Sequence, residues 1–149
     1  MKRINFYSVK QVKEKGGLYG LKSSAINSPD DANDFIKTVL NLYSEANEKF
    51  GILTLNVKNV VAGVHILSIG TLNASMVHPR EVFKAAILNN AASIVCFHNH
   101  PSGDPTPSKQ DIEMNQRICK AGKLMGIECL DNIVVGDDQF ISFKEQGLM

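Results

Sequence analysis

The sequence predicts an α+β protein in which helices pack on a mixed β-sheet. Segments with the 3.6-residue apolar period of helices alternate with short strand-like runs, in the order helix, hairpin, helix, strand, helix, hairpin. The chain has 149 residues, of which 44% are hydrophobic and 21% charged, as in an ordinary globular domain. We therefore expect one domain built around one sheet.

The first third of the chain predicts a short strand and one long helix. Residues 5–9 are apolar and aromatic enough for a strand, and three glycines then interrupt the chain. Ser28-Pro29-Asp30 is typical of a helix start, because serine caps helices and proline is tolerated in their first turn. Apolar residues at helical spacing extend this helix to about Lys49.

A hairpin and a second helix are expected in the middle of the chain. The strand-like runs over residues 52–57 and 60–69 are separated only by Lys58-Asn59, which is typical of a tight turn. The helix is expected over residues 80–90, since Pro79 stands at its start and apolar residues form a stripe along it.

The last third predicts a buried strand, a helix and a final hairpin. Residues 93–98 form a short apolar run, and turn-forming residues follow it. Thr106-Pro107 predicts the cap and first residue of a helix that starts near Ser108 and runs to Met125. Two strands, over residues 131–135 and 139–143, complete the sheet.

Residues able to bind a metal ion gather where the strand over residues 93–98 ends. Alternate residues of a strand share a face, so His98 and His100 can point the same way. Ser108 and Asp111 are three residues apart and project from one face of a helix, toward the histidines. Two imidazoles and a carboxylate suit Zn²⁺ and leave a fourth position for water, whose pKa zinc lowers to about 7. The spacing predicts a hydrolytic zinc site with His98, His100 and Asp111 as ligands.

The same residues resemble a known motif. His98-x-His100-Pro101, followed after six residues by Ser108-x-x-Asp111, is similar to the JAMM motif of the JAB/MPN metalloprotease fold. The resemblance implies zinc ligation by the histidines and the aspartate, and stabilisation of the oxyanion by the Ser108 hydroxyl. Glu48-x-x-Gly51 is similar to the opening of JAMM domains, which implies that Glu48 takes the proton from the zinc-bound water. The implied fold is the mixed, cytidine deaminase-like sheet of JAB/MPN domains.

A narrower resemblance is to the RadC branch of this superfamily, from about Glu48 to the C-terminus. Asn99 is the RadC form of the residue between the histidines, so substrate handling of the deubiquitinase type does not follow. Longer RadC proteins carry a helix-hairpin-helix-like region, which this chain is too short to contain. We expect a basic segment over residues 1–29, within or flanking a RadC-like JAB/MPN domain over residues 30–149. The matching segments are residues 70–73, 77–81, 89–92, 98–104, 130–132 and 134–137.

The expected function is zinc-dependent hydrolysis of a peptide or isopeptide bond in a protein or peptide substrate. Residues 1–28 hold six Lys or Arg and one acid. An alternative function is therefore a module that binds DNA or serves as a scaffold, in keeping with the association of RadC with DNA repair. The net charge of +1 for the whole chain argues against strong DNA binding. A catalytically silent JAB/MPN domain kept for protein interaction is a third possibility. Substrate-binding residues and oligomeric state stay open.

The sequence also predicts a cytoplasmic protein without a membrane segment. It contains no run of about 18 apolar residues, and its basic start lacks the apolar core of a signal peptide. Its cysteines are odd in number and too far apart for a C-x-x-C pair, which argues against a disulfide framework.

Overall fold

The computed structural model describes residues 1–70 and 77–149. Its strands are β1 (Glu48–Leu55), β2 (Val61–Gly70), β3 (Ser93–Asn99), β4 (Glu128–Val135) and β5 (Phe140–Ser142), and its α-helices are α1 (Pro29–Phe35), α2 (Pro79–Leu88) and α3 (Lys109–Met125).

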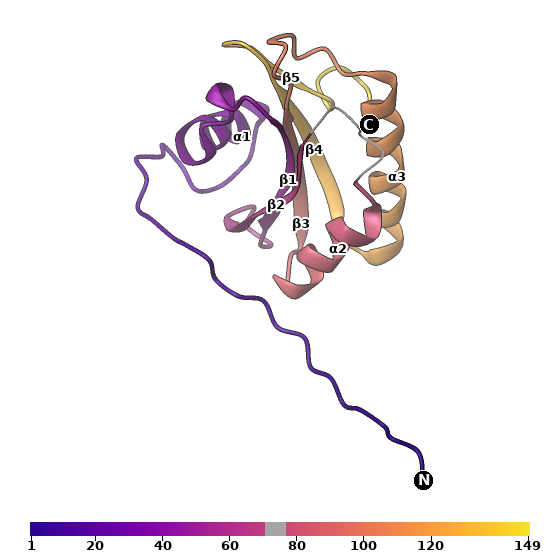
Figure 1. The fold of residues 1–149 in the computed structure, drawn as a ribbon. Helices are drawn as coiled ribbons and strands as arrows, with labels where there is room; N and C mark the ends of the chain where they lie inside the picture. The colour runs from indigo at the N-terminus through magenta and orange to yellow at the C-terminus, as the bar shows by residue number, and fades with distance from the viewer. Residues whose placement is uncertain (71–76) are drawn as a thin grey trace.

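The strands form one mixed sheet in the order β2-β1-β3-β4-β5. β3 and β4 run parallel, and the other neighbouring pairs run antiparallel. Helices α2 and α3 cover one face of the sheet, and α1 covers the other (Figure 1). The predicted α+β class with a mixed sheet is therefore confirmed.

The alternation of side chains along the strands divides the core into two layers. On β3, Ile94 and Cys96 pack with α2 and α3, whereas Val95 and Phe97 pack with α1. Every residue of β3 is buried, because this strand has a neighbour on each side and helices over both faces. An interior strand covered on both faces reads as a continuous apolar run, which is the pattern that the sequence shows here.

β1 and β3 approach each other closely at Gly51. This glycine lies opposite Phe97 in the register of the two strands. A Cβ atom at position 51 would clash with the Phe97 ring and with the backbone carbonyl of His65. The glycine of the Glu48-x-x-Gly51 stretch is therefore required by packing.

Most of the predicted elements are present, with bounds that shift by a few residues. The hairpin is confirmed, although β1 begins earlier than predicted. Its turn is held by Asn56, whose side-chain oxygen accepts hydrogen bonds from the N–H groups of Lys58 and Val60. The cap at Ser28 is also confirmed, since its hydroxyl accepts the N–H of Asp31.

The predicted helix from residue 29 to about Lys49 is wrong in its second half. α1 ends at Phe35, and a π-helical segment (Ile36–Leu40) follows. Asn41 then adopts a left-handed conformation with φ 50°, which ends the helical path. The residues from Glu48 onward pair with β2 and β3 instead, so strand pairing overrides local helical propensity.

Two smaller predictions are also corrected. Residues 5–9 form no strand, since residues 1–20 are exposed and contain no regular element, and a strand needs a neighbour to pair with. Thr106 is not the cap of α3: its N–H and hydroxyl bind the Asp104 carboxylate, and Ser108 is the cap. Of the RadC-like segment over residues 70–73, only Gly70 falls within the described residues.

His78 caps α2, and its Nδ1 accepts the N–H of Arg80 at 3.1 Å.

Within the described ranges, no helix has both the length and the apolar character needed to cross a membrane.

Candidate metal centre

His98 and His100 lie on the same side of the sheet at the end of β3. His98 is the last residue of β3 that faces α2 and α3, because it continues the alternation of Ile94 and Cys96. The N–H of His100 donates to the carbonyl of Val135 at 2.8 Å, so pairing with β4 continues past the end of the strand. The alternation therefore reaches His100, and the two Nε2 atoms lie 3.2 Å apart.

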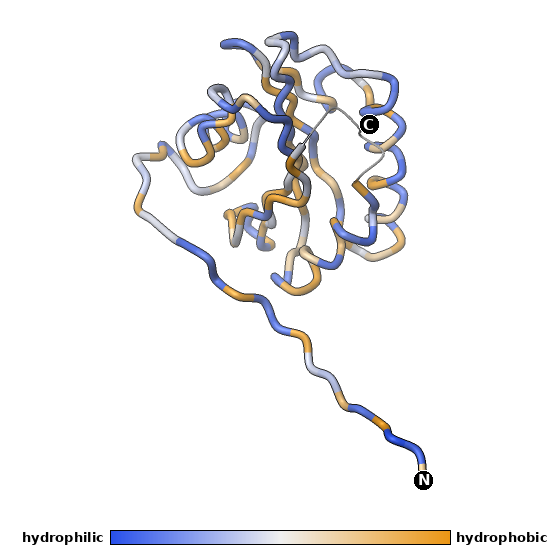
Figure 2. Tube along the Cα trace, in the orientation of Figure 1, coloured by the Kyte–Doolittle hydropathy of each residue, from blue (hydrophilic) through white to orange (hydrophobic). Residues whose placement is uncertain are grey.

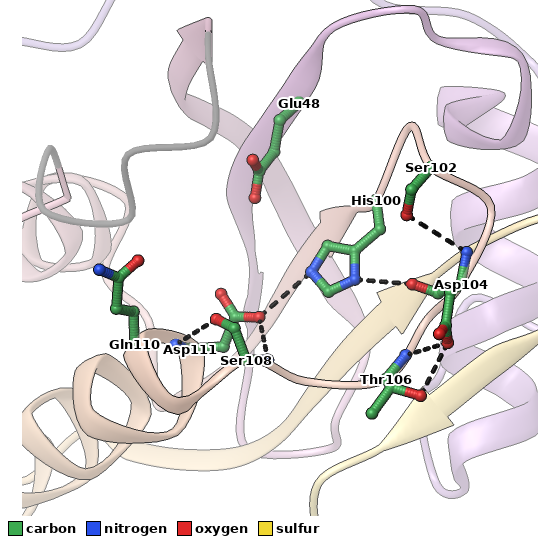
Figure 3. Close-up of a pocket in the computed structure, with 8 residues that line it drawn as sticks. All are labelled: Glu48, His100, Ser102, Asp104, Thr106, Ser108, Gln110 and Asp111. Carbon is green, nitrogen blue, oxygen red and sulfur yellow. Dashed lines mark hydrogen bonds and ion pairs between the residues drawn. The ribbon is translucent and has the colours of Figure 1, made fainter.

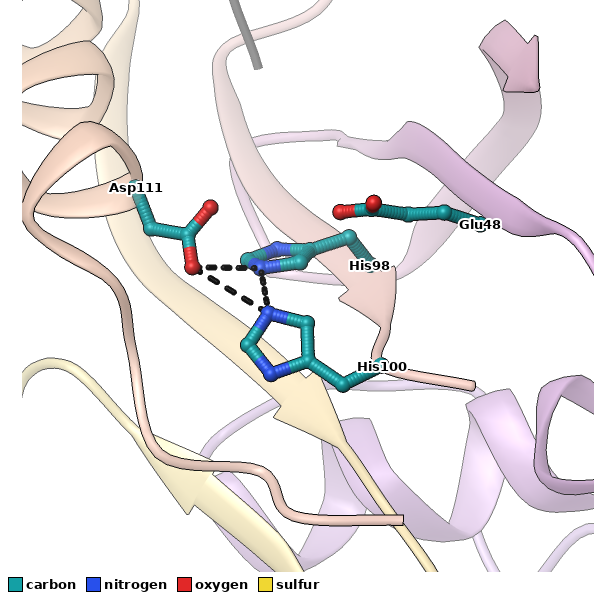
Figure 4. Close-up of side chains that lie close together, drawn as sticks. All are labelled: Glu48, His98, His100 and Asp111. Carbon is teal, nitrogen blue, oxygen red and sulfur yellow. Dashed lines mark hydrogen bonds and ion pairs between the residues drawn. The ribbon is translucent and has the colours of Figure 1, made fainter. Parts of the chain in front are cut away.

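Asp111 reaches the histidines from the first turn of α3. The Ser108 hydroxyl accepts the N–H of Asp111 at 3.1 Å, and the Asp111 carboxylate accepts the N–H of Ser108 at 2.8 Å. This reciprocal capping box determines where the carboxylate points. Its Oδ2 atom lies 3.1 Å from Nε2 of His100 and 3.5 Å from Nε2 of His98 (Figure 4).

These three atoms have the spacing that a metal ion requires. In a tetrahedral zinc site with bonds of about 2.0–2.2 Å, neighbouring ligand atoms lie about 3.3–3.6 Å apart. The observed separations of 3.1, 3.2 and 3.5 Å are close to that range. His98, His100 and Asp111 could therefore hold one metal ion between them.

In its neutral form, His100 presents an unprotonated nitrogen to the cluster. Its Nδ1 lies 2.9 Å from the backbone carbonyl of Asp104. A carbonyl can only accept, so Nδ1 carries the proton in the neutral ring and Nε2 keeps its lone pair. A hydrogen bond from the other ring nitrogen is the usual support of a metal-ligating histidine.

The charge state of Asp111 also suits a metal ligand. Burial raises the pKa of this carboxyl, but the imidazole nitrogens of His100 and His98 beside it outweigh that effect and hold the pKa well below its usual range. The same contact raises the pKa of His100, because a proton on its Nε2 is donated to the Asp111 carboxylate. The carboxylate is therefore ionised at neutral pH and offers negative charge to a cation.

Glu48 joins the cluster through the register of β1 and β3. Phe50 lies opposite His98, so Glu48, two residues earlier on the same face, comes beside His100. Its carboxylate lies within 4.8 Å of the ligand atoms of the other three residues. Figure 4 shows it pointing from β1 toward His98.

Two buried polar atoms of the cluster have no protein partner in the described part of the chain: Oε2 of Glu48 and Nδ1 of His98. Buried polar atoms are nearly always hydrogen-bonded, so such atoms often mark a place for water or an ion. Oε2 of Glu48 is therefore available to a group that the protein itself does not supply.

Asn99 holds the backbone on both sides of Glu48. It projects from the opposite face of β3, where its Oδ1 accepts the N–H of Lys49 at 2.7 Å and its Nδ2 donates to the carbonyl of Asn47 at 3.0 Å. Its partners lie about 50 residues earlier in the chain, so no local sequence pattern could reveal this role.

The cluster opens into a polar pocket of about 280 Å³ (Figure 3). A substrate in this pocket would meet Glu48 on one side and the start of α3 on the other. The lining residues are Glu48, His100, Ser102, Asp104, Thr106, Ser108, Gln110 and Asp111.

The sequence is similar to a family model described as the RadC-like JAB domain, which matches residues 26–148. It is 49% identical over 124 residues to a UPF0758 protein of Bacillus pumilus, covering 83% of this chain and 54% of the relative. It is 51% identical over 122 residues to a UPF0758 protein of Halalkalibacterium halodurans, covering 82% of this chain and 52% of the relative. The chain thus spans about half the length of these relatives. The family match over most of the chain, together with the mixed sheet and the clustered motif residues, shows that this protein belongs to the RadC-like JAB domain family.

Proposed function

We propose that this protein is a zinc-dependent hydrolase of the JAMM type, which cleaves a peptide or isopeptide bond in a protein or peptide substrate. One observation carries the proposal. Three ligand atoms have the spacing of a metal site, and two of their residues, His100 and Asp111, line a pocket together with a carboxylate and a hydroxyl, the groups that amide hydrolysis needs.

Zinc suits the donor set better than magnesium or calcium. Two imidazole nitrogens and one carboxylate oxygen are a zinc-like set, whereas the harder cations prefer oxygen ligands only. His98, His100 and Asp111 would hold the ion. When bound, zinc would lower the pKa of a water molecule toward neutrality and polarise the scissile carbonyl.

Glu48 is the proposed general base. Its buried Oε2 has no protein partner in the described residues and is free to accept a proton from the attacking water. The same carboxyl group would then donate this proton to the leaving amine. Asn99 supports this role from the far side of the sheet, because it holds the backbone that carries Glu48.

Ser108 is the proposed donor to the oxyanion. Its oxygen already accepts the N–H of Asp111 as the cap of α3. A hydroxyl can accept and donate at the same time, so the cap leaves its proton available. That proton would stabilise the negative charge on the carbonyl oxygen as water adds.

The two alternatives have less support. A silent JAB/MPN domain has no need of ligand atoms at metal-site spacing. The DNA-binding alternative depends on the basic residues near the N-terminus, which lie outside the family match at residues 26–148 and form no regular element.

Metal content tests the ligand set. We expect about one zinc ion per wild-type chain by elemental analysis, and loss of that zinc in Asp111→Asn. Asparagine preserves the size of the side chain and can still accept the N–H of Ser108, whereas alanine would also remove half of the capping box. Asp104→Asn is the matched control, since this carboxylate lines the same pocket but lies outside the cluster. A wild-type protein that takes up no added zinc would rule out the proposal.

Glu48→Gln tests the base. Glutamine has nearly the same shape but cannot take up the proton, so we expect turnover of an amide substrate to fall by about 10²–10⁴-fold while zinc is retained. Glu45→Gln is the control, because Glu45 is paired with Lys49 at 2.7 Å and does not line the pocket. Unchanged turnover in Glu48→Gln would remove this residue from the mechanism, and loss of zinc would make it a ligand.

Ser108→Ala separates capping from catalysis. Loss of a helix cap costs about 1 kcal/mol of stability, and loss of one oxyanion donor lowers turnover by about 10²–10³-fold. Ser28→Ala is matched to it, since Ser28 caps α1 in the same way without touching the cluster. Thermal unfolding should be affected in both variants, and turnover only in Ser108→Ala. Equal turnover in the two would leave Ser108 a cap and nothing more.

Asn99→Ala tests whether this side chain positions Glu48. Its loss removes the hydrogen bonds to the half-buried N–H of Lys49 and to the carbonyl of Asn47, at a cost of about 0.5–1.5 kcal/mol for each bond. Asn56→Ala also removes two side-chain to backbone hydrogen bonds, in the β1–β2 turn. We expect both variants to be less stable and both to keep zinc. Only Asn99→Ala should lose turnover and exchange the Lys49 amide hydrogen faster. Full turnover in a folded Asn99→Ala protein would contradict the role.

A further inference from the structure

The N-terminal arm, defined here as residues 1–20, is an extended segment that leaves the body of the protein (Figure 1). Apolar residues are spaced along it between polar ones, as Figure 2 shows. Phe6 is 96% exposed and Ile4 is 78% exposed. Such a segment has strand-like composition but no neighbouring strand within the described residues, and apolar groups exposed in this number are typical of an interaction surface. The large exposed apolar residues of the arm are Met1, Ile4, Phe6, Tyr7, Val9, Val12, Leu18 and Tyr19.

β2 offers an edge to which a strand can be added. It lies at one end of the strand order, and its ten residues include no Lys, Arg, Asp, Glu or Pro. Natural sheets normally protect long edge strands with such residues. Ile66 and Ile69 of β2 are 39% and 63% exposed, and both lie on the face of the sheet that α1 covers, because they pair with Gly51 and Lys49 of β1.

The same edge already binds a short piece of chain at its start. Ala25 forms an antiparallel bridge with Val60, and the N–H of Val61 donates to the carbonyl of Ser24 at 3.0 Å. The chain turns at Tyr19, whose carbonyl accepts the N–H of Leu21 at 2.9 Å. The arm therefore departs from its own domain, and nine residues of β2 remain beyond the bridged end.

Charge favours a second copy of this chain as the partner of the arm. The arm, residues 1–20, carries five Lys or Arg and one Glu, a net charge of +4. The whole chain carries +1, so the remainder carries −3. Opposite charges on arm and body attract each other, which favours association between copies.

We infer that two copies of this chain associate by exchange of arms, with the N-terminal arm of each added as a strand to the β2 edge of the other. Backbone hydrogen bonds pair the arm with β2, and alternate apolar side chains of the arm, Phe6 among them, cover Ile66 and Ile69. The association does not depend on the proposed hydrolase activity.

Sedimentation velocity of the full chain over a range of concentrations tests this inference. Wild type should be a dimer that dissociates on dilution. Phe6→Asp in the arm and Ile66→Lys on β2 should each raise the dimer dissociation constant at least tenfold, with little change in thermal unfolding. Leu124→Lys is the control, because Leu124 is 88% exposed and lies on α3, which covers the other face of the sheet; this variant should remain dimeric.

A mixture of the two disruptive variants gives the sharper result. The Phe6→Asp chain keeps an intact β2 edge, and the Ile66→Lys chain keeps an intact arm. Their heterodimer therefore has one intact contact where each homodimer has none, so mixing should restore association.

A wild-type protein that stays monomeric would overturn the inference, as would a dimer unaffected by both substitutions. Protection of the β2 amides from hydrogen exchange in a monomer would assign the edge to the chain's own arm. If the arm binds a DNA duplex while the protein stays monomeric, the partner of the arm is nucleic acid and the inference is wrong.

Discussion

Phe50 of β1 lies opposite His98 of β3, and this register determines where Glu48 stands relative to the two histidines. It brings Glu48 beside His100 and places Gly51 against Phe97. A slip of one residue would turn Glu48 to the other face of the sheet, because side chains alternate along a strand. The contact between Gly51 and Phe97 opposes such a slip, since no larger residue fits at position 51.

The alternation along β3 gives the residues of the motif two different tasks. His98 and His100 face α3 and form the cluster with Asp111, while Asn99 between them faces the other way and holds the start of β1. One short segment therefore positions both the ligand atoms and the carboxylate of Glu48. This coupling gives a physical reason for an amide at position 99, because an amide supplies the acceptor and the donors that the backbone around Glu48 requires.

The start of α3 likewise combines structure and chemistry. Ser108 and Asp111 satisfy each other's backbone N–H groups, as in many helix caps, and the same bonds direct the carboxylate toward the histidines. The cluster is thus built largely from groups that the fold positions for its own stability. The exceptions are Oε2 of Glu48 and Nδ1 of His98, which have no partner among the described residues, and an unpaired buried polar atom is tolerated best where a ligand or water completes it.

The sequence by itself determined the α+β class, the β1–β2 hairpin and the helices α2 and α3. It also determined the grouping of His98, His100, Ser108 and Asp111. All of these depend on short-range periodicity and spacing. The sequence could not determine the end of α1, the role of Asn99 or the lack of a partner for residues 5–9. Those depend on which segments meet in space: Glu48 joins the sheet because β2 and β3 are there to pair with it, and residues 5–9 stay extended because no segment in the described part of the chain pairs with them. Pairing between distant segments is a tertiary property, and only the folded structure decides it.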